Sequence, residues 1–382
     1  MNYTITALFL MVFALSGCQS TQNSNVSNNL YQADNRADSG RLSSLSFIHR
    51  QGALMAETFN QDKENAFYDW WDREHLLSYA HDRYPELTLS EEESFYRTVR
   101  TKFSNQINGT EMWRFEGVQG DNLVFSAYLT ELPITVLIEY KYLQNIGQRE
   151  LVVVNWRMLH HLTSGLDAYS SYLHNSEVLN QSGYFDLIQS AVNGIKKTER
   201  EVSELFDSLP EALKKDPTLL NDFLWASLEV VPNPSAEFFR QTYPYVPSLT
   251  PENSAFWGYL YMLQDDLEQF KYVRSMAMAN LGYIQTNYAL VGVLYSLQQQ
   301  DYDYAFEQFS HYIKAQPNDA IAYAIYLNNL IDLGLHERAS QVYQALRLQF
   351  NLELVPEDFV EVDPDKLSAF FYSDAMQKVS RL

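Results

Sequence analysis

The sequence has a single cysteine, Cys18, among its 382 residues. One thiol cannot close a disulfide within the chain or supply a thiolate metal site. We therefore expect a fold without disulfides and without a thiolate metal site.

Basic residues are also scarce, with 27 Lys and Arg against 48 Asp and Glu and a formal net charge of −21. Nucleic-acid binding needs a basic face, and so does docking on anionic lipid head groups through protein charge. The composition argues against both kinds of partner. It favours an acidic surface that keeps the protein soluble.

The N-terminal apolar run, Ala7–Leu15, is too short to span a membrane, since a spanning helix needs about 20 apolar residues. Polar residues follow from Gln19 onward, and the run has the length of the apolar part of a secretory signal. The small residues Ser16 and Gly17 suit a protease that binds extended backbone next to its cut.

The segment Leu15-Ser16-Gly17-Cys18 resembles the lipobox of a bacterial lipoprotein signal peptide. The resemblance implies that residues 1–17 are removed and that Cys18 carries a thioether-linked diacylglyceride and an amide-linked acyl chain such as palmitate. Two or more acyl chains anchor a protein durably. By the same resemblance, Gln19 implies an outer-membrane location, facing the periplasm.

After the anchor, the sequence divides into regions of different texture. Residues 18–42 are mostly polar and predict a flexible tether. Residues 43–173 combine helical periodicity, up to about residue 105, with short β-branched and aromatic runs that predict three or four antiparallel strands. This order predicts an α+β domain and weakly resembles the cystatin-like cones of the nuclear-transport-factor type.

The remainder of the chain is predicted to be helical. Residues 174–250 form a helical region with several proline breaks, and residues 251–382 form a repeat region that ends in a capping helix from Asp365. The predicted fold class is therefore α+β, mostly α.

Spacing within residues 251–382 resembles the tetratricopeptide repeat. Ala305, Phe309 and Pro317 fill the small, aromatic and helix-ending positions of the second helix of that repeat, and Ala339 and Tyr343 follow 34 residues after the first two. Upstream, a Gly-x-x-Tyr pattern recurs at the same period. The complete set of predicted repeat-packing residues is Gly258, Tyr261, Gly292, Tyr295, Ala305, Phe309, Pro317, Gly334, Ala339 and Tyr343.

Repeats of this kind usually bind extended peptides on the face made by the first helix of each pair. The residues predicted to form that face are Asn287, Leu290, Leu294 and Gln298 in one copy and Ala324, Asn328 and Asp332 in the next. Leucines stand where a carboxylate clamp would need basic residues, so an apolar groove lined by amides is one interpretation. The other is that a different part of the chain fills this groove.

No motif for catalysis or metal binding is found. The sequence lacks HExxH, GxSxG, GxGxxG and a Walker loop. His160 and His161 are adjacent, so their side chains diverge and cannot easily bind one metal ion together. We predict no enzyme activity, no cofactor and no metal.

These observations favour a membrane-anchored periplasmic lipoprotein that binds an envelope protein or peptide through its helical repeats. Two alternatives stay open. The α+β domain could be a ligand-binding or enzymatic cone, with Trp156 and Tyr169 at its mouth, or the aromatic richness could serve binding of the cell wall or another glycan.

Overall fold

The computed structural model describes residues 39–379 except for 63–68, 86–91, 108, 130–131, 146–147, 233, 353 and 360–361. Cys18, the predicted signal and most of the predicted tether lie outside the described residues. Among the residues that are described, no helix is both long enough and apolar enough to cross a membrane.

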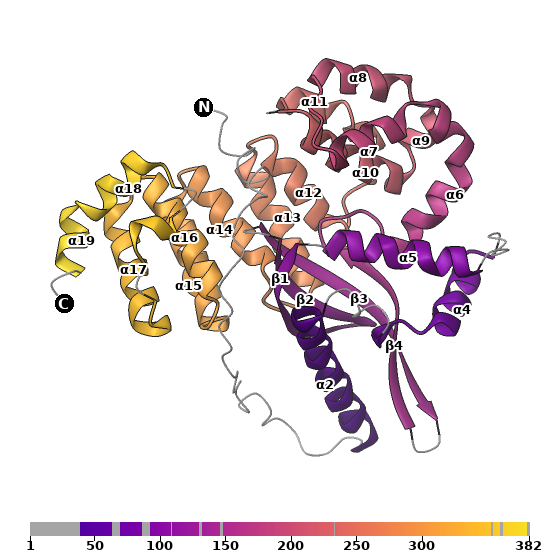
Figure 1. Ribbon diagram of the computed structural model, residues 1–382, viewed down its shortest axis with the longest axis horizontal. Helices are drawn as coiled ribbons and strands as arrows, with labels where there is room; N and C mark the ends of the chain where they lie inside the picture. Colours follow the sequence, from indigo (N-terminus) through magenta and orange to yellow (C-terminus); the bar gives the residue numbers. More distant parts are fainter. Residues whose placement is uncertain are drawn as a thin grey trace.

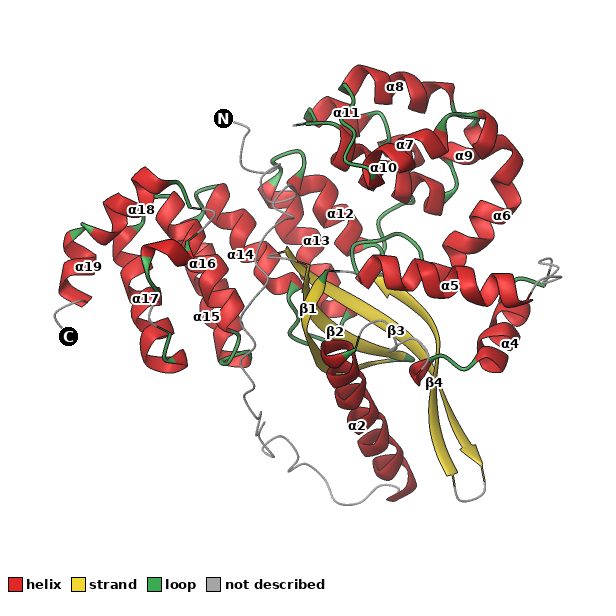
Figure 2. Ribbon diagram, in the orientation of Figure 1, coloured by secondary structure: helices red, strands yellow, loops and turns green. Residues whose placement is uncertain are grey.

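In the described residues, the first part of the structure joins the helices α2, α4 and α5 to a meander of four antiparallel strands, which confirms the predicted α+β class (Figures 1 and 2). Neighbouring strands are consecutive in the chain, in the order β1-β2-β3-β4. The elements are α2 (Ser39–Gln61), α4 (Arg73–Arg83), α5 (Glu92–Ile107), β1 (Thr110–Gln119), β2 (Asn122–Leu129), β3 (Leu132–Asn145) and β4 (Gln148–Met158). Because α2 begins at Ser39, the last residues assigned to the tether are helical, and that end of the tether was predicted wrongly.

Strand β2 is buried on both faces of the sheet. Leu123, Phe125 and Ala127 pack with the N-terminal helices, whereas Val124 and Tyr128 pack with helices from the C-terminal half. This alternation follows from the period of two in a strand. The sheet therefore lies between two helical layers.

Aromatic side chains fill the space between the sheet and the N-terminal helices. Phe103 lies 4.4 Å from Trp71 and 5.2 Å from Trp156 between ring centroids. Gly165 allows this packing, because a β-carbon there would lie 2.3 Å from the Trp156 ring. Trp156 is thus a core residue and not the rim of an open cone.

A capping box between Ser164 and Asp167 starts the next helix, α6 (Gly165–Gln181). The predicted boundary at residues 173–174 falls inside this helix and is wrong. A small helical unit continues the chain, and one hydrophobic core joins residues from Leu179 to Leu260. Its elements are α7 (Tyr184–Val192), α8 (Glu199–Ser208), α9 (Glu211–Lys214), α10 (Pro217–Val230), α11 (Ala236–Arg240) and η1 (Tyr243–Tyr245).

The C-terminal part consists of helix pairs that run side by side away from the sheet (Figure 1). The pairs are α12 (Ser254–Met262) with α13 (Leu267–Asn280), α14 (Tyr288–Gln298) with α15 (Tyr302–Ala315), and α16 (Ala320–Asp332) with α17 (His336–Phe350). A short 3-10 turn, η2 (Pro356–Asp358), precedes the last two helices, α18 (Pro364–Phe371) and α19 (Asp374–Val379). One terminal capping helix was predicted, but α18 ends at Phe371, and Ser373 caps a separate helix, α19, by accepting from the Met376 N–H at 3.2 Å.

Candidate functional site

The face predicted as a groove on α14 is closed within the molecule. Asn287 and Leu290 are 0% exposed and Leu294 is 2% exposed. Tyr128 of β2 and residues of α16 share their hydrophobic cluster, so the leucines pack inside the protein. These three residues therefore do not line an open groove, because other parts of the chain cover them. Gln298 is half-buried at the other end of α14.

Asn287 joins the sheet to the helix pairs by hydrogen bonds. Its Nδ2 donates to the Ala127 carbonyl oxygen at 2.9 Å, and its backbone N–H donates to Ser126 Oγ at 3.0 Å. Its Oδ1 accepts from the Arg114 guanidinium at 2.7 Å. A polar residue predicted to face a partner instead satisfies buried groups of β1 and β2.

Asp319, at the start of α16, is the centre of this buried network. One of its oxygens lies 2.5 Å from Arg114 Nη1 and accepts from the hydroxyls of Tyr128 at 2.7 Å and Tyr312 at 2.6 Å. Its side chain is 0% exposed. Its other oxygen caps α16 through the Ala322 N–H at 3.1 Å. The network fixes the sheet on α14, α15 and α16.

The predicted repeat-packing residues occupy positions at which helices approach closely. Ala305 and Ala339 are fully buried, and Phe309 stacks on Tyr326 with ring centroids 3.7 Å apart. Gly292 makes room for Arg274, whose Nε would lie 2.3 Å from a β-carbon.

The other members of that set lie at contacts and turns. Gly258 faces the Tyr288 hydroxyl, and the Tyr295 ring packs on the Phe270 ring with centroids 4.9 Å apart. The Tyr343 hydroxyl donates to the Leu354 carbonyl oxygen at 2.9 Å, and Tyr261 is half-buried. Gly334 turns the chain with φ +71°, and Pro317 follows α15. These positions are compatible with repeat packing, and membership of the repeat family stays a prediction.

The corresponding face of α16 is not closed. Ala324, Asn328 and Asp332 lie one turn apart along the helix and are half-buried. Asp332 has an ion pair with Lys366 of α18 at 3.6 Å. We call Ile321, Ala324, Asn328 and Asp332 the α16 face. Together with Gln298, it is the part of the predicted groove that solvent reaches.

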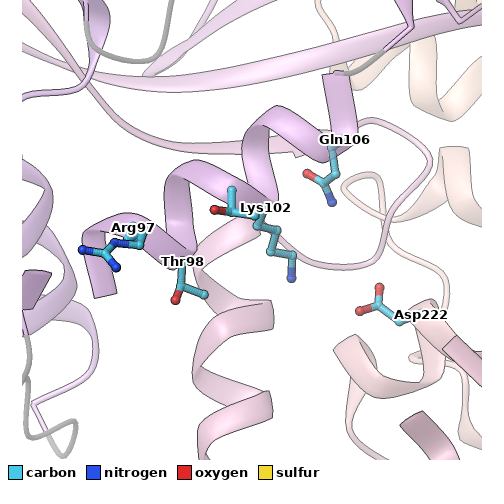
Figure 3. Close-up of a pocket in the computed structure, with 6 residues that line it drawn as sticks. Arg97, Thr98, Lys102, Gln106 and Asp222 are labelled. Carbon is cyan, nitrogen blue, oxygen red and sulfur yellow. The ribbon is translucent and has the colours of Figure 1, made fainter. Parts of the chain in front are cut away.

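A pocket of about 490 Å³ that is largely open to solvent lies between α5 and α10, and we call it the cavity (Figure 3). Arg97, Thr98, Thr101, Lys102 and Gln106 line it from α5, and Asp222 lines it from α10. Lys102 and Gln106 point from α5 toward the side on which Asp222 lies, and Arg97 lies at the far end (Figure 3).

The Lys102 ammonium is the unusual group in this cavity. Its nitrogen is buried and has no hydrogen-bond partner in the described part of the chain. It lies 5.4 Å from the centre of the Tyr172 ring. Burial lowers the pKa of Lys102, and the charges of Asp222 and Asp167 oppose that shift.

The opposite wall is held by hydrogen bonds. Asp222 accepts from the Tyr172 hydroxyl at 2.7 Å and from Asn221 Nδ2 at 3.1 Å. On α5, Gln106 Oε1 accepts from Trp156 Nε1 at 2.5 Å. That bond directs the Gln106 amide, so Trp156 shapes the cavity from the core without lining it. Tyr169, the other residue predicted at a ligand mouth, packs on Phe95 at 4.9 Å.

His160 and His161 lie against Trp225 of α10. The His160 ring is 5.0 Å from the Trp225 ring, and the two histidine rings are 4.7 Å apart. Burial, followed by the charges of Lys102 and Arg157, lowers the pKa of His161 to about 3. No group of three or more His, Cys, Asp and Glu among the described residues is placed to hold a metal ion.

Comparisons with protein-family models, with curated proteins and with solved structures find no match. We therefore classify the protein by its fold alone. It is an α+β protein whose sheet packs on a series of C-terminal helix pairs. The Lys102 cavity was not predicted. A lysine on a helix usually faces solvent, whereas this one lies beside Tyr172 of α6 and lines a pocket with Asp222 of α10.

Proposed function

We propose that this chain is a lipid-anchored protein of the bacterial envelope that works by binding another polypeptide through its C-terminal helix pairs. The lipobox-like segment that ends at Cys18 supports the anchor and an outer-membrane location facing the periplasm. The membrane and an envelope protein or peptide are the partners of this proposal, and it requires no catalysis.

One observation carries the binding part of the proposal. The helix pairs already hold one polypeptide surface, the sheet, on α14 through apolar contacts and buried hydrogen bonds. In the following helix pair, the first helix is α16. The corresponding face of α16 is half-buried at Ala324 and Asn328, so solvent reaches it. A surface that combines small, apolar and amide groups suits a peptide, since the amides can pair with its backbone.

Site-specific photocrosslinking in the native envelope tests this proposal. A photoreactive amino acid at position 324 or 328 should give a discrete crosslinked band, whereas the same group at exposed Gln341 of α17 should not. Ala324→Arg should remove the band obtained from position 328. A band of equal strength from position 341, or none from 324 and 328, would reject the α16 face.

The ligand-binding alternative is favoured by a separate observation, the cavity with its buried Lys102 amine. This alternative does not compete with the anchor or with the α16 face. Lys102 and α16 lie in different parts of the molecule, and each can be tested alone.

A further inference from the structure

The cavity between α5 and α10 is too large to be explained by one structural water. Its volume is about 490 Å³, whereas one water molecule occupies about 30 Å³ in the liquid. Pockets that bind small molecules measure roughly 300–1,000 Å³. The cavity thus has the size of a binding site for a small molecule.

The Lys102 amine needs an acceptor that the described protein residues do not supply. It carries three N–H donors, and its nitrogen is buried with no hydrogen-bond partner among those residues. A buried charge without a partner is strongly unfavourable. Gln106 adds a donor on the same side, because its Oε1 is used by Trp156 and its Nε2 remains for another acceptor.

Asp222 supplies the opposite chemistry across the cavity. Each of its oxygens accepts one hydrogen bond, from Tyr172 and from Asn221, so each keeps capacity for another donor. No direct hydrogen bond joins Asp222 to the Lys102 amine. The cavity is therefore lined by an ammonium from α5 and a carboxylate from α10, with no hydrogen bond between the two groups.

We propose that this cavity binds a small zwitterion of the amino-acid type. The ligand carboxylate accepts from Lys102 Nζ and Gln106 Nε2, and the ligand ammonium donates to Asp222. Thr98, Thr101 and Arg97 line the remainder and accommodate the ligand's side chain. The site is distinct from the α16 face and does not depend on the partner proposed above.

Charge balance selects a zwitterion over simple ions. A ligand with a carboxylate but no amine would satisfy Lys102 but would place an acceptor near Asp222. A ligand with an amine but no carboxylate would satisfy Asp222 but would place a donor near Lys102. A phosphate would bring a second negative charge toward Asp222, since like charges at close range repel. Only a ligand that carries both groups pairs both walls.

Calorimetric titration of the full mature chain with a panel of free amino acids tests the proposal. Acetate, methylamine and inorganic phosphate serve as single-charge probes. At least one amino acid should bind, at least about tenfold more tightly than acetate or methylamine. Lys102→Met should abolish this binding, and Lys215→Met, at an exposed lysine of the neighbouring loop, should leave it unchanged.

Thermal unfolding of the same variants guards against misfolding. Lys102→Met should unfold at an equal or higher temperature than the wild type, because it removes a buried charge that has no hydrogen-bond partner. Three results would overturn the proposal: no binding of any amino acid by the wild type, equal binding of acetate or phosphate, or a large loss of stability in Lys102→Met. The last would make Lys102 a structural partner of Asp222.

Discussion

At the scale of single residues, Gly165 is the position where one added carbon has the clearest consequence. Its β-carbon site lies 2.3 Å from the buried Trp156 ring, which is itself held by Phe103 and by the Gln106 hydrogen bond. The ring cannot move without disturbing the core between the sheet and α5.

We expect Gly165→Ala to lower the free energy of unfolding by about 1–3 kcal/mol, the usual cost of overpacking a core. Urea denaturation followed by circular dichroism measures this change. In a Trp156→Leu background the clashing ring is absent, and the same substitution should cost much less. An equal cost in both backgrounds would place the strain elsewhere.

The paired histidines make stability depend on pH. The folded chain holds the pKa of His161 at about 3 through burial and the nearby cations, while the unfolded chain takes up the proton near pH 6.5. Between these values the unfolded state binds more protons, so this contribution to stability is complete above pH 6.5 and is lost as the pH falls.

His161→Phe keeps an aromatic ring against Trp225 and cannot titrate. Between pH 7 and pH 5 the wild type should lose more stability than the variant, by about 1–2 kcal/mol for this half-buried ring. Chemical denaturation at the two pH values measures the difference. Parallel losses in the two proteins would show that His161 titrates normally when folded.

At the scale of elements, the network around Asp319 holds the sheet on the helix pairs. Asp319→Ala leaves Arg114 without its nearest carboxylate, takes away the acceptor of the Tyr128 hydroxyl and removes the cap of α16. Breaking a buried ion pair from one side costs about 3–5 kcal/mol.

The matched control is Asp332→Ala at the opposite end of α16, where the ion pair with Lys366 is solvent-exposed. Such pairs contribute about 0–1 kcal/mol. Chemical denaturation should therefore separate the two alanine variants clearly. If both cost the same, the Asp319 network does not hold the two parts together.

The elements also show how far the sequence could be interpreted. The β-branched and aromatic runs predicted the strands, because β2 and its neighbours are long, apolar and bounded by turn residues. The start of α6 was missed although Ser164 and Asp167 have capping-box spacing. The break before α19 was also missed. Ser373 caps α19, but a serine can form several other hydrogen bonds, so its presence in the sequence does not by itself predict a helix start.

The candidate sites were less predictable than the elements. Leu290 and Leu294 were recognised as apolar positions on a first helix, but the sequence cannot say whether a partner or the sheet covers them. The position of Lys102 could not be predicted for the same reason, since its neighbours Tyr172 and Asp222 are 70 and 120 residues further along the chain.

At the scale of the whole molecule, the hydrophobic cores cross the predicted domain limits. Val124 and Leu137 of the sheet share a core with Ala255 and Tyr295, and the core of the middle helices extends from Leu179 to Leu260. Cutting the chain at residue 250 would expose apolar surface on both fragments.

We therefore expect the sheet and the helix pairs to unfold together. Tryptophan fluorescence reports on residues 70–257, where all six tryptophans lie, and far-ultraviolet circular dichroism reports on every helix. The two transitions should coincide, and a fragment of residues 43–250 should lack a cooperative transition. Two separated transitions, or a stable monomeric fragment, would show independent domains.

The proposed lipid anchor underlies the proposed location and hence the choice of partners, and one measurement tests it directly. Intact-mass spectrometry of the protein isolated from its native membrane should give a chain that begins at Cys18 and carries the added mass of a diacylglyceride and a further acyl chain. Cys18→Ser should remain unprocessed. A full-length chain with a free Cys18 thiol, recovered from the soluble interior of the cell, would contradict the account.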